Sequence, residues 1–260
     1  MRDVNPTAQA GFGREADRYA RSRPNYPDAL LEWLADSLGL GRGSIVLDLG
    51  AGTGKFTRLL IRCGACVIAA EPVAAMRAQL AAQLPGVTTL AATAQALPLA
   101  AGSIDAVVCA QAFHWFATPA AVTEIHRVLR PGGRLGLIWN VRDERVDWVH
   151  AITQLITPHE GEVPRYYSGT WRGAFRDGLF SDPELAVFPY VHGGDPESVI
   201  IERFASVSFI AAMDAPQKAQ ILAQLRGLIA THPALRGKHL VEFPYQTHAY
   251  CCRRLDPASR

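Results

Sequence analysis

The residues best suited to chemistry lie in a glycine-rich run that reads Asp48-Leu49-Gly50-Ala51-Gly52-Thr53-Gly54. This run follows a short apolar segment and precedes a helical pattern that begins near Lys55. Because glycine lacks a Cβ atom, its backbone can take positive φ and approach a ligand closely. The first turn of the following helix adds unpaired N–H groups and a partial positive charge. The run therefore predicts a ligand-binding loop, although many nucleotide-binding folds have one.

The spacing of the glycines narrows the class of ligand. A dinucleotide loop needs the pattern Gly-x-Gly-x-x-Gly, and its last position falls here on Lys55 or Thr57. Asp48 stands two residues before Gly50, where a carboxylate suits an ammonium group and disfavours a pyrophosphate. The loop therefore favours a nucleoside that carries an amino acid over a dinucleotide.

A second carboxylate lies at the end of the next apolar run. Glu71 stands 17 residues beyond Gly54, and it can accept hydrogen bonds from both hydroxyls of a ribose, as in dinucleotide folds. Pro72 and Met76 then offer apolar surface to an adenine ring. The alternative is a solvated charge at a strand end.

The elements that must position these residues alternate between strand and helix. Continuous apolar runs of this kind are typical of parallel strands buried on both faces of a sheet, and the alternation predicts helices on both faces. The expected strands are 45–47, 67–70, 87–91, 104–110 and 134–140, and the expected helices are 28–38, 55–62, 73–83 and 118–129.

The pattern is less regular after Trp148. Residues 159–183 are rich in glycine, proline, tyrosine and arginine and predict a long loop or cap. A strand is expected over 184–191, a helix over 216–231 and a last strand over 239–255. Because Pro244 lacks an N–H group, that last strand is expected at an edge or a bulge of the sheet. Residues 184–255 are expected to complete the same sheet.

Several motifs in a fixed order carry a resemblance to a known family. They are the glycine run, Glu71-Pro72 with Met76, Ala94 to Pro98, Asp105 to Val108 leading to Ala112 to Phe116, Arg127 to Gly133, and Arg23 to Pro27 before the first helix. Over residues 14–140 the chain resembles class I S-adenosylmethionine-dependent methyltransferases, in the broad group that includes ubiquinone-biosynthesis and trans-aconitate methyltransferases.

The resemblance implies an α/β fold, a Rossmann-like doubly wound sheet of seven strands with helices on both faces. Its strands would be mostly parallel, with an antiparallel C-terminal strand. The chain would be a single domain over 1–260. Within it, 1–40 would cover the cofactor, 41–140 would bind it, 141–183 would form an insertion or cap on the acceptor side, and 184–260 would complete the sheet.

The resemblance also implies residue roles around the cofactor S-adenosylmethionine. Asp48, Gly50, Ala51 and Gly52 would hold its methionine end, and Glu71 its ribose, with Pro72 and Met76 beside the adenine. Ala94 and Gln95 would also lie beside adenine, with Gln95 where many relatives carry an acidic residue. Gln111 would face the reactive methyl group and the acceptor. Tyr19 and Arg23 would fold over the cofactor, with Arg23 pairing with its carboxylate or remaining solvated.

The sequence gives less information about the residues that would bind the methyl acceptor. His114 follows the fourth strand and would serve as a general base if the acceptor must lose a proton; packing of the loop with Trp115 is the alternative. A sulfonium is already activated, so positioning can supply much of the acceleration. Basic and aromatic residues in 141–183 would suit an acidic or flat aromatic acceptor, or would simply cover the core: Arg142, Arg145, Arg165, Tyr166, Tyr167, Trp171 and Arg172.

Composition sets limits on partners and compartment. The net charge is +2, which gives no support to nucleic acid as a partner. Neither a signal peptide nor an apolar run long enough for a membrane helix is evident. The expectation is a cytoplasmic monomer or homodimer with a small-molecule methyl acceptor, no nucleic acid, no membrane and no metal.

The sequence contains five cysteines, two of which are three positions apart. Cys63 and Cys66 have the spacing of a redox dithiol or half a zinc site, but the favoured interpretation is buried structural cysteine.

A nicotinamide-dependent oxidoreductase and a non-catalytic S-adenosylmethionine-binding module are the alternatives to a methyltransferase.

Overall fold

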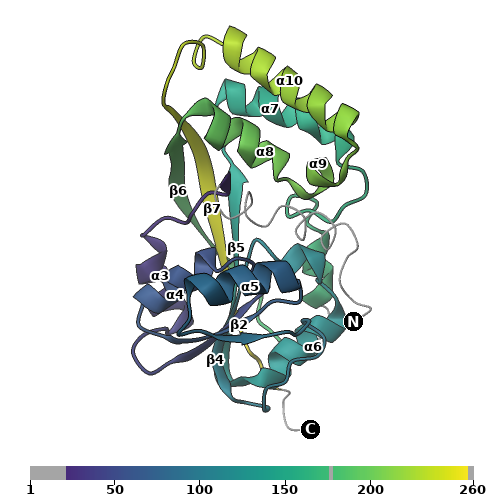
Figure 1. The fold of residues 1–260 in the computed structure, drawn as a ribbon. Coiled ribbons are helices and arrows are strands. Elements are labelled where there is room, and N and C mark those ends of the chain that lie inside the picture. The colour runs from purple at the N-terminus through teal and green to yellow at the C-terminus, as the bar shows by residue number, and fades with distance from the viewer. Residues whose placement is uncertain (1–21, 176–177, 257–260) are drawn as a thin grey trace.

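One seven-stranded sheet runs through the described part of the chain, residues 22–175 and 178–256 of the computed structural model (Figure 1). The strand order is β3-β2-β1-β4-β5-β7-β6. The strands are β1 (Ile45–Leu49), β2 (Cys66–Ala70), β3 (Thr88–Leu90), β4 (Ile104–Ala110), β5 (Leu129–Arg142), β6 (Glu184–Gly194) and β7 (Val241–Arg253). The first five pair in parallel, and β7 runs antiparallel to both of its neighbours. The predicted doubly wound sheet is confirmed.

Helices flank the sheet where the sequence pattern predicts them. They are α3 (Leu30–Leu38), α4 (Lys55–Arg62), α5 (Ala74–Gln83) and α6 (Pro119–Val128). The N-terminus of α6 is capped by Thr118, whose side-chain oxygen accepts from the Ala121 N–H. Among the described residues, no helix is long and apolar enough to cross a bilayer.

Alternate side chains of each central strand enter two different cores. Leu47, Val107 and Leu137 pack on the face covered by α6, whereas Val46, Val108 and Ile138 pack against α3 and α4. Because both faces are apolar, the strands appear in the sequence as unbroken apolar runs.

A second group of helices forms what we call the cap: α7 (Asp147–Ile156), η4 (Glu197–Glu202), α8 (Arg203–Ala205), α9 (Ser208–Ala212) and α10 (Ala215–Thr231). Figure 1 shows these helices gathered at one end of the long strands β5, β6 and β7. Their core includes Ile152, Phe204 and Leu225 together with Phe243 of β7. The cap is thus built from one segment that precedes β6 in the chain and one that follows it. Of the helices in the second segment, the sequence pattern indicates only the one over 216–231.

The position of β7 corrects the edge prediction that was based on Pro244. This strand lies between β5 and β6, and β6 is the edge. Pro244 is tolerated because the pairing of β5 ends at Arg142, opposite Tyr245, and the Pro244 carbonyl then accepts from the Asp143 N–H. The missing N–H group therefore faces the end of β5, where the ladder requires no donor.

Cys66 is also placed differently from expectation. It is exposed, not buried, because it is the first residue of β2, at the amino edge of the sheet, opposite Ile45, which is also exposed. Within the described residues no group of three or more histidine, cysteine or acidic side chains could hold a metal ion.

Candidate functional site

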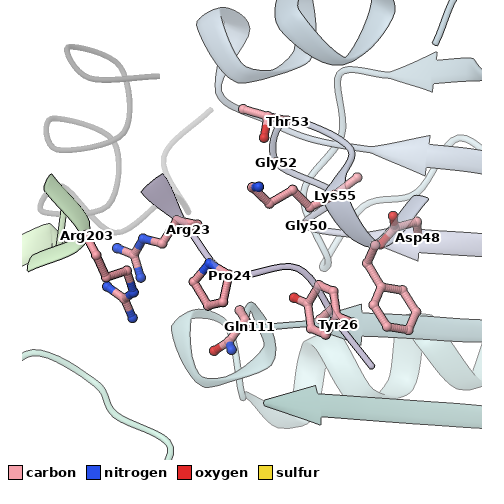
Figure 2. Close-up of a pocket in the computed structure, with 13 residues that line it drawn as sticks. Arg23, Pro24, Tyr26, Asp48, Gly50, Gly52, Thr53, Lys55, Gln111 and Arg203 are labelled. Atoms are coloured by element: carbon pink, nitrogen blue, oxygen red, sulfur yellow. The ribbon is translucent and has the colours of Figure 1, made fainter. Parts of the chain in front are cut away.

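A cavity lies where the direction of strand order reverses, between β1 and its neighbour β4 (Figure 2). Open α/β sheets bind ligands at this point, outside the carboxyl ends of the strands. The loop after β1 supplies one wall, and Ala110 at the end of β4 with Gln111 directly after it supplies another. Figure 2 shows Arg23, Gln111 and Arg203 together on one side and Asp48 on the other.

The glycines of the loop have different tasks. Gly50 and Gly52 both have positive φ, at 75° and 60°. A Cβ atom on Gly50 would stand 2.6 Å from the Cβ of Ala112, so this glycine lets the loops after β1 and β4 touch. A Cβ on Gly52 would find only the Met76 methyl, 4.0 Å away. Of these two, Gly52 is therefore the position with open space for a ligand, and Gly50 allows the loops after β1 and β4 to pack together.

Asp48 is a buried carboxylate with one uncommitted oxygen. Its side chain lines the cavity although the residue is only 1% exposed. Oδ2 accepts from the Thr57 hydroxyl at 2.6 Å, and Oδ1 has no hydrogen-bond partner among the described residues. Burial, together with the charge of Glu71, raises the pKa of Asp48 to about 7. A cation at Oδ1 would offset the free-energy cost of this buried charge.

Glu71 ties the glycine loop to the start of α5. Its Oε2 accepts from the Gly52 N–H at 2.9 Å and its Oε1 from the Val73 N–H at 2.8 Å. Burial raises its pKa above the usual range. Glu71 does not line the cavity around Asp48, but its bond to Gly52 places it directly behind the loop.

The predicted adenine-side residues divide into two groups. Met76 is buried and its methyl lies beside Gly52, whereas Pro72 is half-buried. Ala94 packs in the core, next to the half-buried Gln95. The buried Oε1 of Gln95 has no hydrogen-bond partner among the described residues, so it can accept from an exocyclic amine. None of these four residues lines the cavity around Asp48.

Gln111 has a strained backbone at the end of β4. Its φ of 58° makes it the one non-glycine residue with positive φ in the described ranges. The backbone N–H donates to the Ile138 carbonyl at 2.8 Å, and the side-chain amide donates to the Asn140 carbonyl at 3.4 Å. A left-handed conformation costs roughly 1–2 kcal/mol, and such strain concentrates at functional sites.

A second cavity adjoins the first and lies between the sheet and the cap. Arg23, Gln111 and Arg203 line both cavities. Arg23 also donates from Nη2 to the Ser206 carbonyl at 2.6 Å, which ties the segment before α3 to the cap. Tyr19, the other residue expected to fold over the cofactor, lies outside the described residues.

Only part of the basic and aromatic segment predicted from the sequence lines this second cavity. Its lining residues from that group are Arg142, Arg165, Tyr166 and Tyr167. The others point elsewhere. Arg145 pairs with Asp143, Arg172 lies over the Trp171 ring, and Trp171 itself is buried in the core.

Two basic residues at the site were missed by the sequence reasoning. Lys55 lines the first cavity, and burial with the charges of Arg58 and Arg23 lowers its pKa to about 8. Its position directly after the glycine loop could have predicted from the sequence that it lies at the site. Arg203 comes from the cap, about 90 residues beyond Gln111 in the chain, and no local sequence pattern connects it with the loop.

His114 lies in the wall of the second cavity with one ring nitrogen already engaged. The indole Nε1–H of Trp139 donates to His114 Nδ1 at 3.0 Å. Indole can only donate, so Nδ1 is the acceptor and the neutral ring carries its proton on Nε2. Burial and the charges of Arg165 and Arg23 lower the pKa of His114 to about 3. The geometry favours a hydrogen-bond donor at Nε2 over a proton acceptor, and the predicted role as a base stays a prediction.

We expect the ring of His114 to remain neutral from pH 5 to pH 8. Nitrogen-15 NMR of the eight histidines should include an Nε2–H tautomer whose shifts do not move over this range, because protonation of His114 would need a pH near 3. Loss of that signal in His114→Gln assigns it. A His114 signal that titrates near pH 6.5 would contradict the geometry.

Comparison with known proteins agrees with this architecture. A model described as a methyltransferase domain matches residues 47–137. An uncharacterized methyltransferase-like protein of Schizosaccharomyces pombe is 34% identical over 248 residues, 95% of this chain and 96% of that protein. An uncharacterized methyltransferase of Mycobacterium tuberculosis is 36% identical over 243 residues, 91% of this chain and 92% of that protein.

A solved structure from Anaeromyxobacter dehalogenans that bears the name of a type II methyltransferase shares the fold. Its TM-score is 0.62 at 23% identity, over 89% of this chain and 96% of that chain. Relatives above 30% identity span almost the whole sequence. The chain therefore belongs to the class I S-adenosylmethionine-dependent methyltransferase family.

Proposed function

We propose that this enzyme transfers a methyl group from S-adenosylmethionine to an oxygen or carbon atom of a small-molecule acceptor. The observation that carries the proposal is the junction of the two cavities at Arg23, Gln111 and Arg203. A donor over the glycine loop and an acceptor under the cap would meet at that junction. In-line transfer requires this kind of close approach between the two reactants.

The donor side fits the cofactor in three places. Asp48 has a free carboxylate oxygen for the ammonium group of the methionine part. Each carboxylate oxygen of Glu71 accepts one backbone N–H and retains capacity for a ribose hydroxyl. The unpartnered Oε1 of Gln95 suits the adenine amino group.

When bound, S-adenosylmethionine supplies a methyl group that its positive sulfur has already activated. The protein then needs to orient the acceptor and exclude water. Gln111 stands at the junction, and His114 offers an Nε2–H that can donate to an oxygen of the acceptor. An acceptor that is already ionised, such as a carboxylate, needs no base from this wall.

The lining of the second cavity supports a small acceptor. Trp139 and Tyr166 line it with their rings 4.7 Å apart, and the Tyr166 hydroxyl is fixed against His248 Nδ1 at 2.6 Å. This rigid aromatic wall favours a compact acceptor over a polymer.

Calorimetry with S-adenosylhomocysteine and NAD tests the donor assignment. The wild-type protein is expected to bind S-adenosylhomocysteine and not NAD. In Glu71→Gln the affinity should fall about tenfold or more, since an amide NH₂ would face a backbone N–H and a charge-assisted acceptor is lost. Glu184→Gln, on the exposed edge strand β6, is the matched control and should bind normally.

Binding of NAD without S-adenosylhomocysteine, or an unchanged affinity in Glu71→Gln, would overturn the donor assignment. A metabolite screen with methyl-labelled S-adenosylmethionine then tests transfer itself. Label that appears in a small product supports the enzyme, whereas tight cofactor binding without label transfer over a broad panel favours a binding module.

A further inference from the structure

Among the described residues, the lining of the second cavity contains more guanidinium groups than carboxylates. Arg23, Arg142, Arg165 and Arg203 line it, against Glu144 and Glu160. Isolated buried cations are costly, so proteins pair them or reserve them for a ligand. The hydrogen bonding of each arginine therefore shows what the cluster is built to hold.

Arg203 is the least compensated of them. It opens α8 in the cap and is 8% exposed. Its Nε and Nη1 are buried without a hydrogen-bond partner among the described residues. The guanidinium carbon lies 5.5 Å from the centre of the Phe204 ring, which supports its plane but accepts no hydrogen bond.

Arg165 reaches the same cavity from the segment between α7 and β6. Its Nε and Nη2 are also without hydrogen-bond partners among the described residues. The nearest carboxylate oxygen, Oε2 of Glu160, stands 3.9 Å from Nε, beyond hydrogen-bond distance. The ring of Phe209 lies 4.9 Å from the guanidinium carbon and fixes it from one side.

Arg142 completes the group from the end of β5. Burial lowers its pKa, and the charge of Arg203 lowers it further. Arg165 shows the same direction of pKa shift, from burial and from the charges of Arg142 and Arg203. The guanidinium carbons of Arg142 and Arg203 lie 5.8 and 5.5 Å from the centre of the same Phe204 ring, and Arg165 lines the same cavity. An anion between these like charges would offset their repulsion.

We propose that Arg142, Arg165 and Arg203 form an anion-binding subsite that holds a carboxylate or phosphate group of the methyl acceptor. This inference rests on the proposed function. A guanidinium fork is opposite in charge to both groups and can donate two parallel hydrogen bonds to two oxygens of either one. Arg142 and Arg165 line only the acceptor cavity, so the anion is an anchor under the cap, and the reacting atom points to the junction at Gln111.

The test measures anion binding by calorimetry with succinate, inorganic phosphate and the neutral diamide succinamide as probes, with and without S-adenosylhomocysteine. The wild-type protein should bind at least one anion and not succinamide. Preference for succinate or for phosphate then identifies the anchoring group. In Arg165→Gln and Arg142→Gln the anion affinity should fall about tenfold or more.

Two controls keep the outcome clear. Arg226→Gln removes an exposed cap arginine that pairs with Glu197 and should bind the anion like the wild type. Arg142→Lys keeps the charge without the fork and should recover only part of the affinity. S-adenosylhomocysteine affinity, measured on every variant, confirms that the cofactor side remains folded.

Succinamide binding as tightly as succinate, or an undiminished anion affinity in both Gln variants, would overturn the subsite. Failure of the proposed function has a different signature, because the protein would then bind no S-adenosylhomocysteine or would bind the cofactor without transferring its methyl group. Anion binding measured without that ligand still decides the subsite.

Discussion

Replacing Gly50 with alanine is expected to lower the free energy of unfolding by about 2–5 kcal/mol and to weaken S-adenosylhomocysteine binding more than tenfold. Two costs combine. The φ of 75° is unfavourable for any residue with a Cβ, and the new methyl would stand 2.6 Å from the Ala112 Cβ. The Ala112 Cβ is attached directly to the backbone, so relief requires the loop after β4 to shift.

The shift of the loop after β4 is the reason why ligand binding should also weaken. Ala112 follows Gln111, whose strained backbone lines the junction of the two cavities. The loop that holds Gly50 is itself anchored by its N–H to the Ala70 carbonyl at 2.8 Å, so it cannot yield easily. The two walls of the cofactor cavity are therefore expected to separate, and binding to fall with stability.

Gly43→Ala is the matched control for this prediction. Gly43 has a φ of 89°, but no heavy atom lies within 4 Å of its would-be Cβ. It should cost only the backbone strain of about 1–2 kcal/mol and leave S-adenosylhomocysteine affinity unchanged. Denaturant unfolding and calorimetry on both variants give the comparison. Equal losses of stability in the two variants would show that the contact with Ala112 contributes nothing.

The donor half of the site could be predicted because its signals are local in sequence. Asp48 and Glu71 each close an apolar run, and parallel strands bring their carboxyl ends to one edge of a sheet. The glycine spacing by itself argues against a dinucleotide. The local pattern does not reveal that Gly50 serves loop packing, since that contact involves Ala112 after another strand.

The acceptor half could not be predicted in the same way, because it depends on contacts between distant segments. Arg203 reaches the cavity only through the packing of the cap on β7, and its sequence neighbours are ordinary helix residues. Pro244 favours an edge strand by its chemistry alone, but the deciding fact is where β5 ends. Tertiary context overrides local propensity in both places.

Asp48→Asn is expected to stabilise the ligand-free protein above pH 7 and to weaken S-adenosylhomocysteine binding about tenfold or more. In the wild type the buried carboxyl has a pKa near 7, against 3.8 for an unburied aspartate. Between these values the native state holds a proton that the unfolded state has lost, so stability falls as pH rises from about 4 to about 7. The full effect is on the order of 4 kcal/mol.

Asparagine removes this dependence and keeps the Thr57 contact, because its amide oxygen can still accept from the hydroxyl. Glu71 is present in both proteins, so the difference in unfolding free energy between them reports Asp48 together with its coupling to Glu71. That difference should grow in favour of the variant from pH 4 to pH 7 and then stay constant. Urea unfolding at several pH values measures it.

The pH dependence of ligand binding should be opposite to that of stability: affinity should rise with pH where the stability of the ligand-free protein falls. An ammonium group pairs with ionised Asp48, so wild-type affinity for S-adenosylhomocysteine should rise from pH 5.5 to pH 7.5, with protons released on binding at the lower pH. The variant should bind weakly and without this pH dependence. Asp105→Asn, at the amino end of β4 where it pairs with Arg130, should keep the wild-type profile. A flat wild-type profile would show that Asp48 does not contact the cation, and the ammonium group would then have to be placed elsewhere in the cavity.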